Sequence, residues 1–481
     1  MGPALRLGRH ERTRDPRPPP GGRVPGHRHA AVVGDPSPPT AGRRRWWPAI
    51  LASMDATTTP DAERPNPAGQ TDDLGVIRPL RTLWLVSGLH AANHAIGFVL
   101  PLVYLAVAAE FLIGADEIAF LAAATALSAG LLQLAFSSLT RVAARRVLLG
   151  VGGLVMGAGM SLLATTTSFA TFAAVTIASR LGGAPQHPVG NALLSEQFPP
   201  ARRGFAISAH IAGGNVGTLL VPIVGATLIA GAGWRSTVVV FGLIAAVVSI
   251  AALAFIRESG ADRAAARASG SVRSGFRRLL ADPDHRWLYL SSVLGGGGRG
   301  LGIVNLFALL HLRDVAGIDE ATAALMYGVL LAFSVPGPLV AGWLSDRLGR
   351  KPLIVGVYLG GAGSFVLFVA AGSDPLWLWA AIVLMGCFSF AESPQLQALL
   401  ADTTPGELRD VSYSAFFTIA FVGGSIWTAA YGAVIGALGE SAGLPVVFWL
   451  MAAAFVLAAL ATLPIRVVRH ERTPLVSVDV G

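Results

Sequence analysis

Three charged residues of this sequence lie inside long apolar runs: Arg180, Arg299 and Glu392. If the runs cross a membrane, a charge at the centre of a helix costs about 2.5–3.5 kcal/mol, so each such residue calls for a reason. A carboxylate beside arginines is suited to reversible proton binding, because burial and a nearby cation act on its pKa in opposite directions. We predict that Glu392 carries a proton, with Arg180 and Arg299 as charge partners. The alternative is a buried Arg299–Glu392 ion pair that only holds two helices together.

Uncharged polar residues and histidines recur at helical spacing in the same runs. The predicted lining of a central substrate cavity is His90, Asn93, His94, Gln186, His187, Asn191, His210, Asn215, Asn305 and Gln395. For each single histidine, a hydrogen-bonded structural role is at least as good an interpretation as proton transfer. The sequence contains no H-E-x-x-H, G-x-S-x-G or P-loop pattern, so it predicts no metal, no cofactor and no enzymatic activity.

The elements that must position these residues are membrane-spanning helices. The chain has 481 residues, of which 53% are hydrophobic and 13% charged, whereas roughly 25% of the residues of soluble proteins are charged. Runs of about 20 apolar residues are long enough to cross a bilayer as helices. The twelve predicted spans are residues 83–108, 117–139, 147–166, 169–194, 205–230, 237–256, 287–312, 321–344, 353–371, 376–400, 411–438 and 444–465.

Loop charges predict the orientation of these spans. Arginines gather in alternate loops and in the long central loop, which by the positive-inside rule makes both termini cytoplasmic in the cell membrane. The net charge of +8 is spread over these loops without a basic groove, so no nucleic-acid partner is expected. The predicted divisions are a tail (1–79), a six-helix half (80–256), a cytoplasmic linker (257–285), a second six-helix half (286–468) and a cytoplasmic tail (469–481).

The tail is rich in proline and arginine, a composition typical of disorder. A change of composition at Met54 suggests that translation starts there. The alternative is a disordered cytoplasmic tail in which residues 43–47 contact anionic lipid.

The two halves are similar to each other. Residues 188–194 of the fourth span match residues 394–400 of the tenth, and each segment continues at one spacing to an acid and an arginine, Glu196 and Arg203 or Asp402 and Arg409. Glycines 213–214 of the fifth span recur at 423–424 of the eleventh. Repeated halves of this kind predict a secondary transporter with its site between them, near the middle of the membrane.

A charged hairpin between the eighth and ninth spans, residues 342–352, resembles the loop signature G-x-L-x-D-R-x-G-R-K of the major facilitator superfamily. Its motif residues here are Gly342, Asp346, Arg347, Gly349 and Arg350. The resemblance covers about residues 80–468. It implies twelve helices in two pseudo-symmetric halves, alternating access and a monomer. It also implies that the hairpin latches one conformation, with the aspartate capping a neighbouring helix and the arginine joining a charge network.

The matching loop of the first half departs from this signature. Arg141 stands where the aspartate is expected, and Ser137 and Ala144 replace the two glycines. We therefore expect the second-half hairpin to be the only intact latch of the pair.

The sequence also resembles the fosmidomycin-resistance branch of the superfamily, which exports small drugs. The resemblance lies in His90-x2-Asn93, His187-Pro188 and the glycine-rich segment 213–217; the departures are His94 and Val189, where the branch often has acids. Residues 213–225 are similar to the glycine-proline signature of proton antiporters. The expected function is proton-coupled efflux of a small polar or anionic compound or drug. The alternative is a proton-coupled uptake symporter for an organic acid, and a non-transporting membrane sensor is a weaker one.

Overall fold

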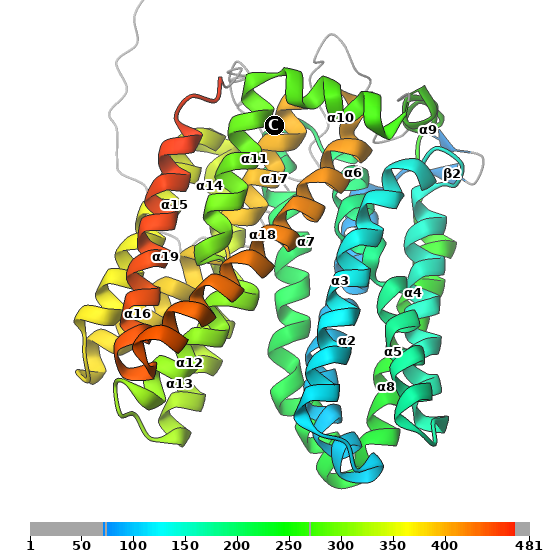
Figure 1. Ribbon diagram of the computed structural model, residues 1–481. Coiled ribbons are helices and arrows are strands. Elements are labelled where there is room, and N and C mark those ends of the chain that lie inside the picture. Colours follow the sequence, from blue (N-terminus) through cyan, green and yellow to red (C-terminus); the bar gives the residue numbers. More distant parts are fainter. Residues whose placement is uncertain (1–70, 73–74, 269–270, 467–481) are drawn as a thin grey trace, which may run out of the picture. The chain divides into compact units, whose positions relative to one another are not determined.

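The computed structural model describes residues 71–72, 75–268 and 271–466 (Figure 1). The predicted tail through residue 70, with the candidate start at Met54, and residues 467–481 lie outside this part of the chain. The described residues are helical apart from their short loops and a two-residue antiparallel pairing of β1 (Thr71–Asp72) with β2 (Gly75–Val76). The prediction of an all-α membrane protein is therefore confirmed.

The first half begins with a proline at the first position of α2, where its missing N–H is not needed. Its helices are α2 (Pro79–Phe111), α3 (Ala115–Leu139), α4 (Arg145–Leu162), η1 (Leu163–Thr165), α5 (Phe169–Gly182), η2 (Ala184–Gln186), α6 (Pro188–Gln197), α7 (Pro200–Leu220), η3 (Val221–Gly225) and α8 (Ala226–Phe255). The first three predicted spans agree with these bounds within a few residues, because apolar composition fixes where a helix can lie in lipid. The fourth span is divided into three helices, and the fifth and sixth form one segment over Pro200–Phe255.

The linker and the second half are also helical. The linker carries α9 (Gly260–Ala268) and α10 (Val272–Ala281). The second half consists of α11 (Pro283–Gly295), η4 (Gly296–Gly298), η5 (Gly300–Val304), α12 (Asn305–Asp314), α13 (Glu320–Phe333), α14 (Pro336–Leu348), α15 (Arg350–Ala370), α16 (Pro375–Phe388), α17 (Glu392–Thr403), η6 (Gly406–Leu408), α18 (Arg409–Leu438) and α19 (Glu440–Thr462). Leu279 of α10 packs on Leu408 and Val411, which attaches the linker to the second half.

Within the described residues, nine helical segments are long and apolar enough to cross a membrane, or ten if the pair 283–298 and 300–314, bent by 45°, counts as one span. One segment, Pro200–Phe255, has 56 residues. At 1.5 Å per residue it is about 84 Å long, well over twice the ~30 Å of a bilayer core. Gly233, with φ 77°, interrupts it between two predicted spans. The fold is thus consistent with twelve spans.

Several spans are broken near their middle, and the breaks position the candidate site residues. Pro185 and Pro188 interrupt the fourth span, because proline removes an N–H and obstructs the preceding turn. His187 therefore lies at the start of α6. A run of glycines breaks the seventh span on either side of Arg299, and the tenth span is interrupted just before Glu392, the first residue of α17. Broken spans are common around transporter sites, where backbone groups face the substrate.

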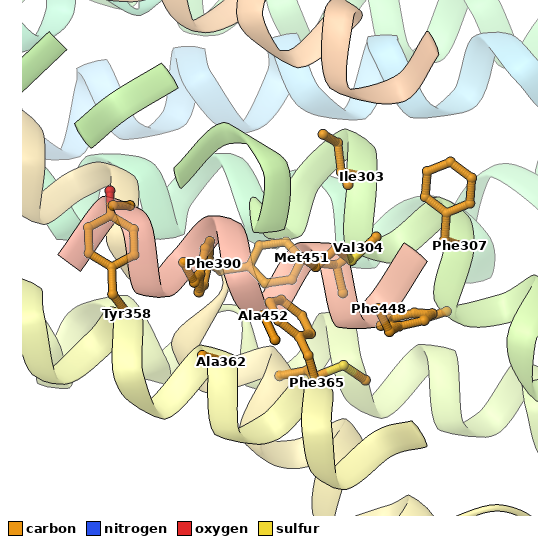
Figure 2. Close-up of a cluster of buried hydrophobic side chains, with 14 of the residues drawn as sticks. Ile303, Val304, Phe307, Tyr358, Ala362, Phe365, Phe390, Phe448, Met451 and Ala452 are labelled. Carbon is orange, nitrogen blue, oxygen red and sulfur yellow. The ribbon is translucent and has the colours of Figure 1, made fainter. Parts of the chain in front are cut away.

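Each half buries its own apolar cluster. In the first half the cluster includes Ile96, Met156 and Phe172, and in the second Tyr358, Phe365 and Phe448. Figure 2 shows part of the second cluster, in which aromatic rings from several helices interdigitate. Small residues bring the helices close together: a Cβ on Gly213 of α7 would meet the backbone of Ser87 in α2. Such close approach is a main source of helix association in lipid.

Candidate functional site

Arg299 and Glu392 form an ion pair inside the second half. Arg299 Nε donates to Glu392 Oε1 at 2.5 Å, and Arg299 Nη2 donates to the Ser292 carbonyl at 3.3 Å. The Glu392 side chain is fully buried, whereas that of Arg299 is 18% exposed. Among the described residues, Glu392 Oε2 has no hydrogen-bond partner. The carboxylate thus has one oxygen held by an arginine and a buried second oxygen, and the Tyr358 hydroxyl lies beside it.

The broken backbone holds this pair in place. Gly300 N donates to the Ser389 carbonyl at 2.9 Å, which joins the break of the seventh span to that of the tenth. A side chain at Gly300 would collide with the ring of Phe390, so only glycine permits this approach. Because a backbone hydrogen bond joins the two breaks, the side chains of Arg299 and Glu392 are held within contact distance of each other.

Arg180 lies in the first half and has other partners. Its Nη1 donates to the Asn93 carbonyl at 3.0 Å and to Asn93 Oδ1 at 2.8 Å. Its guanidinium also packs beside Gly97, which lies on α2 like Asn93. The structure therefore brings together two of the three charged residues singled out from the sequence, and it places Arg180 with Asn93.

Four of the predicted cavity residues form a cluster of imidazole rings. The ring centroid of His90 lies 4.4 Å from that of His94, 4.6 Å from that of His187 and 4.3 Å from that of His210. His90 and His210 are fully buried. The His187 ring lies 4.9 Å from Phe417 of α18. The cluster therefore belongs to the first half but touches the second.

The remaining predicted cavity residues mostly bond to backbone or across the two halves. Asn215 Nδ2 donates to the Ser334 carbonyl at 2.8 Å, and Gln395 Nε2 donates to Ser208 Oγ at 2.9 Å, so both residues join the halves. The other three have local roles. Asn191 Nδ2 donates to the His187 carbonyl, Asn305 Oδ1 accepts from Gly302 N, and Gln186 is fully buried.

The second-half hairpin binds the beginning of α7. Asp346 accepts hydrogen bonds from the backbone N–H groups of Gly204 at 2.9 Å and Phe205 at 2.8 Å. Arg350 donates to Asp346 at 2.5 Å, to Asp402 at 2.8 Å and to the Pro200 carbonyl at 2.6 Å. An acid at the N-terminal end of a helix is favoured by the helix dipole. We call this set of contacts the α7 latch.

Three other motif residues of the hairpin have distinct surroundings. Gly349 has φ 97°, which a residue with a side chain rarely adopts. A side chain at Gly342 would collide with Ser208 and the Gly204 carbonyl. Arg347 stacks over the ring of Trp343 at 3.7 Å and lies outside the α7 latch.

A second network around Arg145 was missed from the sequence. Arg145, 1% exposed, donates to Asp410 through Nε at 3.0 Å and Nη2 at 2.8 Å. It also donates to both carboxylate oxygens of Glu196, at 2.9 and 3.0 Å, and to Glu258 at 3.4 Å. Burial raises the pKa of Glu258, and the charge of Arg145 offsets part of that rise. We call this set the α18 latch, because Asp410 lies in the first turn of α18.

The second-half hairpin is therefore not the only loop of the pair with such a charge network, and the role of either network as a latch stays a prediction. When the two loops are superposed, Arg145 takes the position of Arg350 and Arg141 that of Asp346. When the repeated segments are superposed, Asp410 takes the position of Gly204. The first-half loop lacks the aspartate of the signature, but Asp410 of the second half supplies a carboxylate to Arg145. The signal was present in the sequence but required both superpositions together.

Known proteins resemble this chain over most of its described length. The model of the Major Facilitator Superfamily matches residues 83–428. The chain is 24% identical over 307 residues to a probable L-galactonate transporter of Escherichia coli (strain K12), covering 59% of this chain and 67% of that protein. It is 26% identical over 393 residues to a gallate transporter of Pseudomonas putida, covering 73% and 85%.

The fold matches a solved structure of the family with TM-score 0.68 and 15% identity, covering 81% of this chain and 96% of that one: the proton:xylose symporter XylE bound to 6-bromo-6-deoxy-D-glucose. A family match over more than half of the chain, together with this fold, makes the protein a multi-pass membrane transporter and not an enzyme. The chain belongs to the Major Facilitator Superfamily of secondary transporters.

Proposed function

We propose that this protein is a proton-coupled symporter that takes up a small organic anion. The observation that carries the proposal is the Arg299–Glu392 ion pair, in which the carboxylate is buried and the arginine is partly exposed. The names of the relatives support the chemical class, because galactonate and gallate are both carboxylates.

The ion pair links the proton to the anion through the same arginine. While Glu392 is ionised, it neutralises Arg299 and competes with any anion for the guanidinium. A proton on Glu392 removes that competition, so Arg299 becomes available to a substrate carboxylate. Proton and anion then favour each other's binding, and by linkage the coupling is reciprocal. This is the requirement for symport. An antiporter instead needs the proton and its substrate to exclude each other, which this pair would achieve for a cation.

The latches complete the proposed cycle. With both termini cytoplasmic, as the loop charges predict, the α7 and α18 latches close the cytoplasmic side, and the protein faces outward. Rocking of the two halves would open the latches and release proton and anion inside. We also propose that the protein acts as a monomer in the cell membrane, needing only protons and its substrate.

The test is transport by purified protein in liposomes, with gallate and L-galactonate as radiolabelled probes. A symporter accumulates the probe when the vesicle interior is alkaline, and an antiporter when it is acidic, whichever way the protein is inserted. We expect accumulation only with an alkaline interior. Accumulation only with an acidic interior would refute symport.

A variant assigns the coupling to its residue. Glu392→Gln keeps the shape of the side chain but cannot lose a proton, so we expect it to lose stimulation by the pH gradient while exchange of internal for external probe continues. Glu440→Gln, which changes an exposed acid of α19, is the matched control and should behave like the parent. Full gradient-driven uptake by Glu392→Gln would show that the proton is carried elsewhere.

Proton-driven efflux is the second candidate. It is favoured by the segment 213–225, which is similar to an antiporter signature and contains the π-helical turn η3. The resemblance to the fosmidomycin-resistance branch remains a prediction, and the liposome assay with fosmidomycin and an acidic interior tests it directly.

A further inference from the structure

Three histidines of the imidazole cluster point ring nitrogens at a common centre. One nitrogen from each of His90, His94 and His187 lies within 4.8 Å of the other two. His90 and His94 are one helical turn apart on α2, so their side chains share a face, while His187 comes from the break before α6. A tetrahedral zinc ion, with Zn–N distances of ~2.0–2.1 Å, separates its ligand atoms by about 3.4 Å. Small ring rotations would therefore close the three nitrogens around one ion.

In two of the rings, hydrogen bonds hold Nδ1 and leave Nε2 free to bind a metal ion. His90 Nδ1 lies 2.9 Å from the His210 carbonyl, which can only accept, so Nδ1 carries the proton and Nε2 keeps its lone pair. His94 Nδ1 lies 3.2 Å from Thr218 Oγ1, and that hydroxyl donates to the Gly214 carbonyl. His94 Nδ1 is thus also the donor, and its Nε2 is free. Metal-binding histidines are commonly held in this way by a carbonyl or another acceptor behind the ring.

Two ring nitrogens of these three histidines have no hydrogen-bond partner in the part of the chain that the structure describes. They are His90 Nε2 and His187 Nδ1, both buried. A buried polar atom without a hydrogen bond costs free energy of about 1–3 kcal/mol. Two such atoms in one cluster of imidazoles are explained if an ion binds them.

We propose that His90, His94 and His187 bind a divalent transition-metal ion of the zinc type. Three neutral imidazoles suit zinc, copper, nickel and cobalt, and leave one tetrahedral position open. The Arg180 guanidinium lies near His94 and His187, so the open position should take an anion or hydroxide. The site lies in the first half, whereas the Arg299–Glu392 pair lies in the second. The inference therefore goes beyond the proposed symport and does not depend on it.

Binding is measured on the full-length protein in detergent, purified with a tag that contains no histidine. Equilibrium dialysis with Zn²⁺ gives the stoichiometry and affinity, and Co²⁺ provides visible absorption bands that report tetrahedral coordination. The variants are His94→Ala, His187→Ala and Thr218→Val, the last of which removes the acceptor behind His94 while keeping the size of the side chain. His311→Ala, a buried histidine of the second half that packs on Phe368 and Phe448, is the matched control. The thermal unfolding temperature of each variant checks its fold.

We expect one tightly bound ion per chain in the parent and in His311→Ala, with the tetrahedral cobalt spectrum. His94→Ala and His187→Ala should lose this ion, and Thr218→Val should bind it on the order of 10- to 100-fold more weakly. If an alanine variant fails to fold, Thr218→Val decides. Absence of saturable binding in the folded parent, or unchanged binding in Thr218→Val and the folded histidine variants, would overturn the proposal. This experiment measures metal binding and not transport. The metal site can therefore be refuted without refuting the proposed symport, and the reverse.

Discussion

Removing one carboxylate from the α18 latch should open the end of the molecule that this latch closes. The change is Asp410→Asn, which keeps the shape of the side chain and removes its charge. Asp410 is 5% exposed and accepts two hydrogen bonds from Arg145. Arg145 retains Glu196 and Glu258 as partners within the first half and the loop that follows it. The substitution therefore weakens the contact between the halves without leaving the arginine uncompensated.

The magnitude follows from the kind of bond lost. A hydrogen bond to a charged group contributes about 1.5–3 kcal/mol when it is buried. In the open state Asp410 would face water, so this energy stabilises only the closed state. Since 1.4 kcal/mol is a factor of ten, Asp410→Asn should raise the ratio of open to closed molecules by on the order of 10- to 150-fold.

The assay is the distance between two spin labels at this end of the molecule, measured by pulsed electron resonance. Val142 in the first-half loop is 78% exposed, and Leu348 at the end of α14 is 61% exposed, so cysteines at these positions can be labelled. Cys387, the single cysteine of the chain, is replaced by serine. Opening of the latches should shift the distance distribution toward longer values.

The control is Glu407→Gln on the same side of the second half. Glu407 pairs with Arg278 of the linker at 3.2 Å, with side chains 38% and 57% exposed. Exposed pairs contribute about 0–1 kcal/mol, so this variant should change the ratio by no more than about fivefold. If Asp410→Asn left the distances as in the parent, or moved them no further than Glu407→Gln, the α18 latch would not hold the closed state.

Two further comparisons use the pseudo-symmetry of the halves. Asp346→Asn weakens the acceptor of two backbone N–H groups in the α7 latch, so initial transport rates in liposomes should fall by on the order of tenfold. The control Arg141→Gln should change these rates less than twofold. If both variants transported equally well, the hairpin would have no role in transport. Gly213→Ala forces a methyl group against Ser87 and should lower the unfolding temperature, with a cost of about 1–3 kcal/mol. Gly423→Ala in the matching span of the other half meets only ordinary contacts and should be neutral, and an equal loss in both variants would argue against close packing as the cause.

The sequence was informative where a single physical constraint decides the structure. Lipid accepts only helices of sufficient length with apolar surfaces, so the bounds of α15 and α18 could be predicted within a few residues from composition. The contact of Arg299 with Glu392 belongs to both interpretations of these residues from the sequence, whereas Arg180, the other predicted partner of Glu392, bonds to Asn93.

The remainder depended on how the two halves face each other. Asp410 follows the tenth span in an ordinary loop-to-helix sequence, and nothing local to it indicates that Arg145 is its partner. The sequence predicts each histidine separately as a cavity residue. Their convergence depends on the close contact of α2 with α7 and on the break before α6, and these are tertiary features that spacing along one helix does not contain.

The α18 latch has a consequence for building chimeras between this transporter and its relatives. The linker is the natural crossover point, because most of each apolar cluster lies on one side of it. A crossover there, however, would part Arg145 from Asp410 and Arg203 from Asp402, since each arginine contacts an acid on the other half. Consider a relative that has the usual aspartate in its first loop and no acid at the position of Asp410. Its first half joined to the second half of this chain would place two acids near Arg145, and the reverse hybrid would place neither of them there. Functional hybrids should therefore require that residues 141, 145 and 410 come from the same parent.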